Sequence, residues 1–429
     1  MPDSLTIQLI NQSTSQNVYA FITGLAIQRN MARVFLKPDG RSLYFPESPP
    51  AGQILQPLTE ACAIPLGAPG NSVTVTIPQM AGGRIWFSAE QQLTFLRNPG
   101  GPGGGAALVE PSVLNPTDPN ADVDFTFCEF TLNNDQLFAN ISYVDFVARM
   151  PIALTLQTLG GAVQHVSGMA PDGLDRVCAG LREQAAKDGR PWDKLVVQRK
   201  GQDRPMRVLN PSHGDAVGAS FGGYFEPLVE AAWKKYGQQG QQQQQQGGEK
   251  KQHHHKLRFP LRLFSKGPDP EPQQAHAQAV LRINTQAAAG IVEGFVPAGS
   301  NDLVIGGEPF VRPTTADILG CNTGPFTTGP SPMRNAIIPR LAAAFQRGCI
   351  CEVSEHPSQP ETFYTGDPTN HYSRIVHDCN LDGKGYAFAY DDVQPDGGSD
   401  QSGKVNAGDP RVFVVAVGGG GAYVGDRMP

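Results

Sequence analysis

Short apolar runs separated by turn residues recur along the first 165 residues of the chain and limit what it can fold into. The runs are rich in Val, Ile, Phe and Thr, which fit the pleated surface of a β-sheet. The 49 glycines and 37 prolines of the 429-residue chain agree with many turns and long loops. The strands expected from these runs are Leu5–Ile10, Val18–Ile22, Val73–Ile77, Ile85–Phe87, Leu93–Leu96, Phe125–Leu132, Leu137–Val147 and Ile152–Leu156.

The apolar period changes to a helical one from about residue 170. The expected helical faces are Leu174, Val177, Cys178 and Leu181; Phe225, Leu228, Val229, Ala232 and Trp233; and Ile337, Ile338, Leu341 and Phe345. We therefore predict a mixed α/β domain over residues 166–365. Strand-forming segments and tight turns return after Thr369, for example at Val412–Val417, so residues 1–165 and 366–429 are expected to form one discontinuous β domain. The predicted fold class is a β-rich α+β protein with an inserted α/β domain.

A glutamine-rich stretch interrupts the α/β region. Residues 237–256 contain the run Gln241–Gln246 and the three histidines His253–His255. Such a composition cannot bury a core, so we predict a disordered insertion here rather than a domain boundary. Three successive histidines do not converge on one ion, and a specific metal site is not expected there.

The charge balance and the cysteines exclude several classes of protein. A formal net charge of -6 offers no basic surface for nucleic acid, and no apolar run approaches the roughly 20 residues of a membrane span. The seven cysteines are an odd and scattered set, too sparse for a disulfide framework, and Cys349 and Cys351 lack the two-residue spacer of zinc and redox motifs. We expect no metal or other cofactor, no nucleic-acid or membrane partner, and a monomer.

Two carboxylates, Glu129 and Asp145, lie within β-prone apolar runs. An acid in such a run costs desolvation energy and is tolerated mainly where it is paired, hydrogen-bonded or open to a wet cleft. Two such acids close together can perform acid/base chemistry, and glycoside hydrolysis is the reaction most often built from a carboxylate pair alone. Ion pairs and turn contacts perturb carboxylates equally well, so the pair by itself also fits a structural role.

The connection between the two expected strands decides whether the acids can meet. A tight hairpin turning at Asn133–Asn134 would pair Glu129 with Phe138 and leave Asp145 about seven residues, or roughly 23 Å, further along. A long loop centred near Leu137 would instead make Glu129 and Asp145 direct or diagonal neighbours, with Cβ atoms about 5 to 8 Å apart. Of the two, we expect the second register, because it alone allows shared chemistry.

Several phrases are spread along the chain: Leu5–Asn11, Ala107–Ser112, Phe127–Thr131, Asn140–Phe146, Asn370–His377 and Asp382–Phe388. Together they resemble the β-1,3-glucanases of glycoside hydrolase family 64, and the resemblance spans nearly the whole chain. The segment Tyr386–Asp392 also resembles the tyrosine and double-aspartate turn of thaumatin-like proteins, a fold relative of that family.

This resemblance implies a thaumatin-like β-barrel domain and an α/β domain that flank a broad groove for β-1,3-glucan. Similar members are inverting, endo-acting enzymes that cut laminarin-type chains, into laminaripentaose in the best-known type. The family's general acid corresponds to Glu129 and its general base to Asp145, sixteen residues apart as in the family pattern. Inverting enzymes hold the two carboxyl groups about 6.5 to 9.5 Å apart. We expect that spacing, with Glu129 kept protonated by apolar neighbours.

The same resemblance implies where sugars are bound. Thr131, Asn133 and Ser142 fall at sugar-contacting positions. Phe138 falls where the family has a larger aromatic side chain, which departs from the family pattern at one stacking contact. Glu110 lies in a family-like loop and is the next acid to consider for the substrate site; the alternative for it is a loop carboxylate held by nearby amides.

Two other classes of function stay open. A noncatalytic, thaumatin-like glucan-binding protein would keep the groove without turnover. A structural or storage protein is suggested only by Gln241–Gln246. The family resemblance implies secretion, whereas the opening residues lack the charged and apolar regions of a secretory signal, so the location is left open.

Overall fold

The computed structural model describes residues 3–101, 105–237, 279–286 and 289–419. Residues 238–256 of the predicted insertion therefore lie outside the described residues. No helix within the described ranges is long and apolar enough to cross a membrane.

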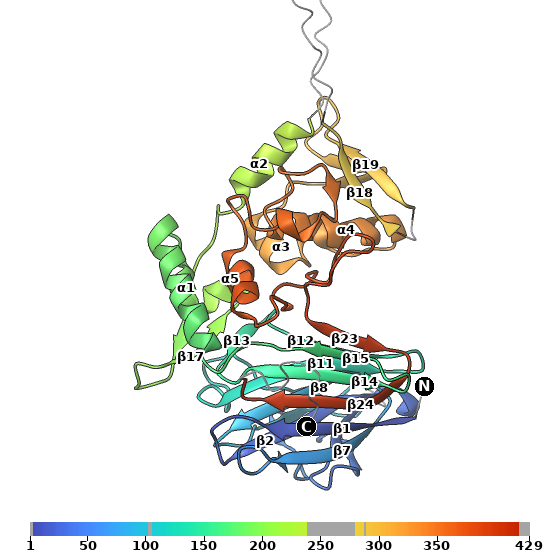
Figure 1. Ribbon diagram of the computed structural model, residues 1–429, viewed down its shortest axis with the longest axis vertical. Coiled ribbons are helices and arrows are strands. Elements are labelled where there is room, and N and C mark those ends of the chain that lie inside the picture. Colours follow the sequence, from blue (N-terminus) through green and yellow to red (C-terminus); the bar gives the residue numbers. More distant parts are fainter. Residues whose placement is uncertain (1–2, 102–104, 238–278, 287–288, 420–429) are drawn as a thin grey trace, which may run out of the picture.

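Two β-sheets pack against each other and form one body of the molecule (Figure 1). The smaller has the strand order β15-β14-β24-β1-β7, and the larger has the order β23-β12-β11-β8-β2-β3-β4, with β6 paired to β2. The strands of the smaller sheet are β1 Ser4–Asn11, β7 Ser72–Pro78, β14 Ile152–Thr158, β15 Val163–Val166 and β24 Pro410–Val417. The strands of the larger sheet are β2 Val18–Ala26, β3 Ala32–Leu36, β4 Leu43–Tyr44, β6 Ile64–Pro65, β8 Met80–Ala89, β11 Asp124–Leu132, β12 Leu137–Ile141 and β23 Lys404–Ala407. Buried side chains of both sheets, such as Ile7, Val415, Ile85 and Phe130, form one apolar core.

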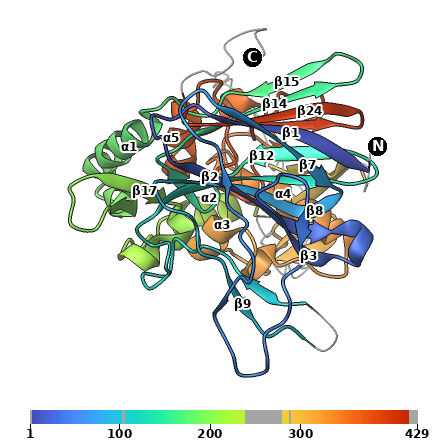
Figure 2. The same cartoon turned by 90° about the horizontal axis from the view of Figure 1, so that it is seen from below.

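The end of the chain returns to the first strands. Strand β24 lies between β14 and β1 and runs parallel to β1, with Ile7 opposite Phe413. Strand β23 pairs with β12 in the larger sheet. Both strands, drawn in red in Figure 1, lie among strands of the N-terminal half, and Figure 2 shows β14, β24 and β1 side by side from below. These pairings agree with the expected return of the chain, and the division into two domains stays a prediction.

The described part of the chain also contains three further sheets and several helices. The sheets are β10-β9-β5 (Ala107–Val109, Leu96–Asn98, Gln56–Pro57), β13-β17-β16 (Phe146–Ala148, Pro205–Leu209, Val196–Gln198) and β21-β20-β19-β18-β22 (Glu308–Phe310, Leu303–Ile305, Ile291–Phe295, Leu281–Asn284, Glu355–His356). The α-helices are α1 Gly173–Asp188, α2 Glu226–Lys235, α3 Thr315–Gly320, α4 Pro332–Gln346 and α5 His371–Cys379. The short 3-10 helices are η1 Ile27–Arg29, η2 Pro191–Leu195, η3 Pro211–Val217, η5 Gly324–Phe326 and η6 Pro360–Thr362. Helices α2, α3 and α4 lie with β18 and β19 at the end of the molecule away from β1 and β7 (Figure 1).

The three predicted helical faces are confirmed. Leu181 in α1, Trp233 in α2 and Phe345 in α4 are buried. The expectation of strands and turns directly after Thr369 is wrong, because α5 begins there and Asn370 caps its first turn by accepting a backbone N–H. The buried apolar side chains of α5 recur at helical spacing, at Tyr372, Ile375, Val376 and Cys379. The predicted strand Leu93–Leu96 is displaced to Leu96–Asn98.

A glycine in β8 leaves room for an aromatic ring of the neighbouring strand β11. Gly83 of β8 lies opposite Phe130 of β11. A Cβ atom at Gly83 would lie 2.4 Å from Cζ of Phe130, closer than such atoms can approach. The ring therefore lies across the backbone of β8 on the core face. Because side chains alternate along a strand, the next residue, Arg84, is on the other face.

A buried charge cluster joins α4, α5 and the turn before β23. Asp391 forms ion pairs with Nη2 of Arg347 at 3.2 Å and with Nε2 of His377 at 2.9 Å. The side chains of Arg347 and Asp391 are 2% and 1% exposed. Asp391 also accepts the backbone N–H of Ala387 at 2.9 Å. Because an unpaired charge in this position would be costly, the cluster fixes how the two helices meet the turn.

Titration of His377 should make the protein less stable as the pH rises. Burial disfavours the charged imidazolium, but the charge of Asp391 and the hydrogen bond to it outweigh burial, so the pKa of His377 lies above its ordinary value of 6.5. The charged form therefore stabilises the folded state fully below pH 6.5, and this contribution is lost as the pH rises through the folded-state pKa. The free energy of unfolding in urea should decline less steeply above pH 6.5 for His377→Gln than for the wild type. Parallel curves for the two proteins would contradict this.

Candidate active site

A line of polar side chains crosses one face of the larger sheet. Glu129 of β11 lies opposite Arg84 of β8 on one side and Asn140 of β12 on the other. Asn140 is in turn opposite Lys404 of β23, and Arg84 is opposite Thr23 of β2. Directly opposed residues of neighbouring strands share a face of the sheet, so these side chains form one row, which we call the polar row.

An aromatic cluster borders the polar row. Trp86 and Phe127 are opposed on β8 and β11, two residues from Arg84 and Glu129, and therefore share their face. Their ring centroids are 4.7 Å apart, and the guanidinium carbon of Arg84 lies 5.0 Å from the ring centroid of Phe127. Cys128, on the opposite face of β11, is buried in the core. The acid and the core thus lie on separate faces of the strand.

Arg84 binds two carboxylates at once. Its Nε and Nη2 donate to Oε1 of Glu129 at 3.2 and 3.1 Å, and its Nη1 donates to Oε2 of Glu110 at 2.6 Å. The expected apolar setting of Glu129 is therefore incomplete: Phe127 shares its face of the strand, but its direct partner is a guanidinium. The partner of Glu110 is the same guanidinium, where amides were the alternative expected. The side chain of Glu129 is 38% exposed, so it also remains open to solvent.

The loop between β11 and β12 is shorter than the sequence led us to expect. Leu132 and Leu137 face each other, so the predicted long loop centred near Leu137 is wrong. Residues 133–136 make the turn instead. The side chain of Asn133 closes this turn by accepting two of its backbone N–H groups, at 2.9 Å each.

Asp145 reaches the neighbourhood of β11 by another route. Strand β12 ends at Ile141, so the expected strand through Val147 is wrong. Residues 143–145 form an irregular turn, and β13 begins directly after it and belongs to a different sheet. Asp145 is therefore not a cross-strand neighbour of Glu129.

Partners from distant parts of the chain hold the backbone of this turn. The N–H of Tyr143 donates to the carbonyl of Tyr386 at 2.8 Å, and the hydroxyl of Tyr372 donates to the carbonyl of Tyr143 at 2.7 Å. The N–H of Asn210 donates to the carbonyl of Asp145 at 3.0 Å. The position of Asp145 thus depends on α5, on the turn before β23 and on the start of η3.

His213 contacts the carboxylate of Asp145 directly. Its Nε2 lies 3.2 Å from Oδ1 of Asp145. His213 belongs to η3, which Asn210 caps by accepting the backbone N–H of Ser212 at 3.0 Å. The side chain of Asp145 is 45% exposed, so one of its oxygens is held while the carboxylate stays open to solvent.

Ring packing brings the segment of Asp145 against the strand of Glu129. The ring centroid of Phe146 lies 6.0 Å from that of Phe127 and 5.4 Å from that of Phe125. Phe146 directly follows Asp145, and Phe127 precedes Glu129 by two residues on the same face of β11. The segment that carries Asp145 is therefore packed against the strand that carries Glu129 through this aromatic cluster.

The other predicted sugar contacts fall into two groups. Thr131 and Phe138 are directly opposed on β11 and β12 and share the face of Glu129. Asn133 lies in the hairpin turn, and Ser142 lies just beyond the end of β12. Contact with sugar at these positions stays a prediction.

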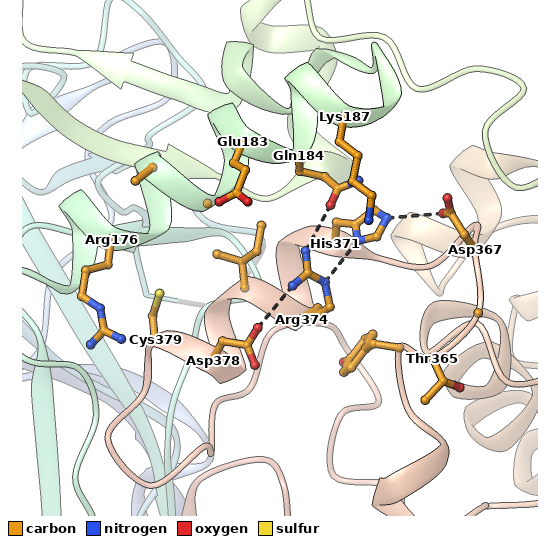
Figure 3. Close-up of a pocket in the computed structure, with 15 residues that line it drawn as sticks. Arg176, Glu183, Gln184, Lys187, Thr365, Asp367, His371, Arg374, Asp378 and Cys379 are labelled. Atoms are coloured by element: carbon orange, nitrogen blue, oxygen red, sulfur yellow. Dashed lines mark hydrogen bonds and ion pairs between the residues drawn. The ribbon is translucent and has the colours of Figure 1, made fainter.

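A cavity of about 710 Å³ lies elsewhere, between α1 and α5 (Figure 3). Arg374 projects into it and donates hydrogen bonds to His371, Gln184 and Asp378. Neither candidate acid lines this cavity. It is therefore not part of the candidate site.

The candidate site is built from carboxylates, a guanidinium and an imidazole. Among the described residues, no group of three or more His, Cys, Asp or Glu is placed to hold a metal ion. The seven cysteines are all free thiols, and burial raises the pKa of the Cys128 thiol well above its ordinary value. Cys128 is thus a buried apolar side chain beside the acid, as a small core residue would be.

Sequence reasoning missed Arg84 and His213. A sequence signal for Arg84 did exist. Arg84 directly precedes the predicted strand Ile85–Phe87, and alternation puts it on the same face as Trp86. His213 left none, since 68 residues separate it from Asp145 along the chain.

A pair of carboxylates open to solvent is the catalytic group of most glycoside hydrolases. The family model described as β-1,3-glucanase matches residues 3–260 and 273–417. The chain belongs to this family, glycoside hydrolase family 64. It is 28% identical over 335 residues to the glucan endo-1,3-β-glucosidases of Cellulosimicrobium cellulans and of Arthrobacter sp. (strain YCWD3). Each match covers 75% of this chain and 50% of the relative, so the chain spans about half the length of these curated relatives.

Solved structures show the same β-rich fold. A laminaripentaose-producing β-1,3-glucanase in complex with laminaritetraose aligns with a TM-score of 0.75 and 25% identity, over 97% of this chain and 99% of that one. A β-1,3-glucanase domain from Clostridium beijerinckii aligns with a TM-score of 0.68 and 20% identity, over 97% and 98% of the two chains. The β-rich part of the predicted fold class is confirmed by these likenesses.

Proposed function

We propose that this protein is an endo-acting β-1,3-glucanase that hydrolyses laminarin-type glucan with inversion. Glu129 is the general acid and Asp145 is the general base. The observation that carries this proposal is a pair of half-exposed acids on two segments that pack together through aromatic rings, in a chain that belongs to the β-1,3-glucanase family. The complex of a similar enzyme with laminaritetraose supports β-1,3-glucan as the substrate.

The reaction needs one proton given and one taken. Glu129 gives its proton to the glycosidic oxygen while the bond from this oxygen to the anomeric carbon breaks. Asp145 takes a proton from a water molecule, and the oxygen of this water bonds to the same carbon from the opposite side. The new reducing end therefore has the α configuration, and no covalent bond to the protein forms. Solvent returns the proton from Asp145 to Glu129 before the next cycle.

The remaining residues of the site bind and orient the sugar. We assign sugar contacts to Thr131, Asn133, Phe138 and Ser142. The direct opposition of Thr131 and Phe138 beside Glu129 supports a subsite next to the bond that is cut. The contact of His213 with Oδ1 supports a fixed orientation of the Asp145 carboxylate.

The finer description of the fold belongs to the same proposal. We propose that the two large sheets are a thaumatin-like domain, that an inserted α/β domain faces it across the glucan groove, and that the protein acts as a monomer. The return of β23 and β24 to strands of the first half supports a discontinuous β domain.

Hydrolysis of laminarin with sizing of the products tests the proposed function. The purified protein should release short oligosaccharides of several sizes from the first minutes, because an endo-acting enzyme cuts within the chain. Binding of laminarin without release of reducing sugar would contradict the proposal and would identify a noncatalytic glucan-binding protein.

A further inference from the structure

Glu110 and Glu129 occupy different parts of one guanidinium. Nη1 of Arg84 binds Glu110, whereas Nε and Nη2 bind Glu129. The side chains of Arg84, Glu110 and Glu129 are 31%, 24% and 38% exposed, so water screens their charges only in part. A change of charge on one carboxylate therefore changes how strongly the guanidinium holds the other.

The charges of this cluster do not balance. With both carboxylates ionised, one positive charge faces two negative charges, and one negative charge is left over. With a single proton on either carboxylate, the cluster would carry no net charge. Without the charge of Glu110, Arg84 and ionised Glu129 would already form a neutral pair.

Two groups near the cluster in the described part of the chain, Lys404 and Tyr386, do not remove this imbalance. Lys404, two strands away on the polar row, is paired with Asp400 at 3.5 Å. Burial raises the pKa of Tyr386, with smaller contributions from neighbouring carboxylates that include Glu129. Its neutral hydroxyl donates to Asp392 at 3.0 Å. Neither Lys404 nor Tyr386 therefore offsets the second negative charge of Glu110 and Glu129.

We propose that Glu110 is a positioning residue for the general acid: it shares Arg84 with Glu129 and so lets Glu129 hold the proton that the glycosidic oxygen receives. This inference rests on the proposed function, in which Glu129 is the acid. It gives Glu110 a role that acts through Arg84 rather than through contact with sugar.

The variant Glu110→Gln tests this role, since it keeps the shape and one oxygen acceptor but removes the charge. The charge of Arg84 is then balanced by Glu129 alone, which favours the ionised acid. The alkaline limb of the profile of kcat/KM for laminarin against pH should move to lower pH by about one unit, while the acidic limb stays. Activity on the alkaline side should fall about tenfold. An unmoved alkaline limb would overturn the proposal, and so would an equal loss at every pH, which is the result expected of a sugar contact.

A substrate with a good leaving group separates the acid function from other roles. In a dinitrophenyl glycoside of a laminari-oligosaccharide, the dinitrophenolate leaves without receiving a proton. The Glu110→Gln variant should therefore cleave this substrate at nearly the wild-type rate at alkaline pH. Equal losses on this substrate and on laminarin would overturn the proposal. Glu90→Gln is the matched control, because Glu90 directly follows the strand of Arg84 and its carboxylate accepts hydrogen bonds from the surface side chains of Ser15 and Asn17. It should leave both activities unchanged.

The variant Arg84→Met should shift the alkaline limb in the opposite direction. It also tests the proposal if Glu110→Gln does not fold. Loss of the guanidinium leaves Glu110 and Glu129 as neighbouring acids, so the alkaline limb should move to higher pH. A limb that stays or moves to lower pH would overturn the proposal. A wild-type protein that does not hydrolyse laminarin would refute the proposed function itself. An active wild type, an inactive Glu129→Gln and an unmoved limb in Glu110→Gln would refute only this inference.

Discussion

Glu129→Gln should lower kcat/KM for laminarin by about 10²–10⁴-fold, the contribution of a general acid in most enzymes. Glutamine cannot give a proton to the glycosidic oxygen, but it has nearly the same shape and can still accept a hydrogen bond from Arg84. The fold should therefore be kept, and the thermal midpoint of unfolding should stay close to that of the wild type. Release of reducing sugar by variant and wild type, assayed side by side, measures the effect.

Two comparisons make the result for Glu129 specific. A dinitrophenyl laminari-oligosaccharide should restore much of the lost rate, because its leaving group needs no proton. Glu90→Gln should keep wild-type activity on both substrates, since Glu90 directly follows β8 and lies outside the candidate site. Near-native laminarin hydrolysis by a folded Glu129→Gln would remove Glu129 as the acid.

Asp145→Asn should lower kcat/KM for laminarin by a similar factor, about 10²–10⁴-fold, because an amide cannot take a proton from the attacking water. Here the activated glycoside should not restore the rate, since the missing step is activation of water and not departure of the leaving group. This difference assigns the two acids to different roles. Asp215→Asn is the matched control, because Asp215 is an exposed carboxylate in η3, the same short helix as His213.

A small anionic nucleophile offers a second check on Asp145. Azide needs no base, so added azide should restore turnover of the activated glycoside by Asp145→Ala and should yield the α-glycosyl azide. A β-glycosyl azide, or full activity of Asp145→Asn on laminarin, would contradict the role of Asp145 as the base.

The sequence correctly predicted on which face of its strand Glu129 lies. Alternation along 125–132 correctly put Glu129 on the face away from the core residues Cys128 and Phe130. The helical faces of α1, α2 and α4 were also correct, because each repeats apolar residues over several turns. Such local periods are visible in the sequence since they depend on neighbours only a few residues apart.

The placement of Asp145 was the part that could not be predicted. Sequence spacing suggested a strand through Val147, whereas the structure ends β12 at Ile141 and turns the chain away. The partners that hold the turn, Tyr372 and Asn210, are distant in the chain, and no local pattern reports such contacts. The hairpin register was missed for a different reason, because the side chain of Asn133 closes a short turn that competes with the longer loop.

Proton NMR of laminarin hydrolysis by the wild-type protein, recorded in the first minutes before mutarotation, tests the pairing of Glu129 and Asp145 across one glycosidic bond most directly. The predicted result is that the α-anomeric proton signal of the new reducing ends grows first and the β signal follows. A β signal that grows first would contradict inversion and would require a carboxylate that attacks carbon, with the two acids about 5 to 5.5 Å apart.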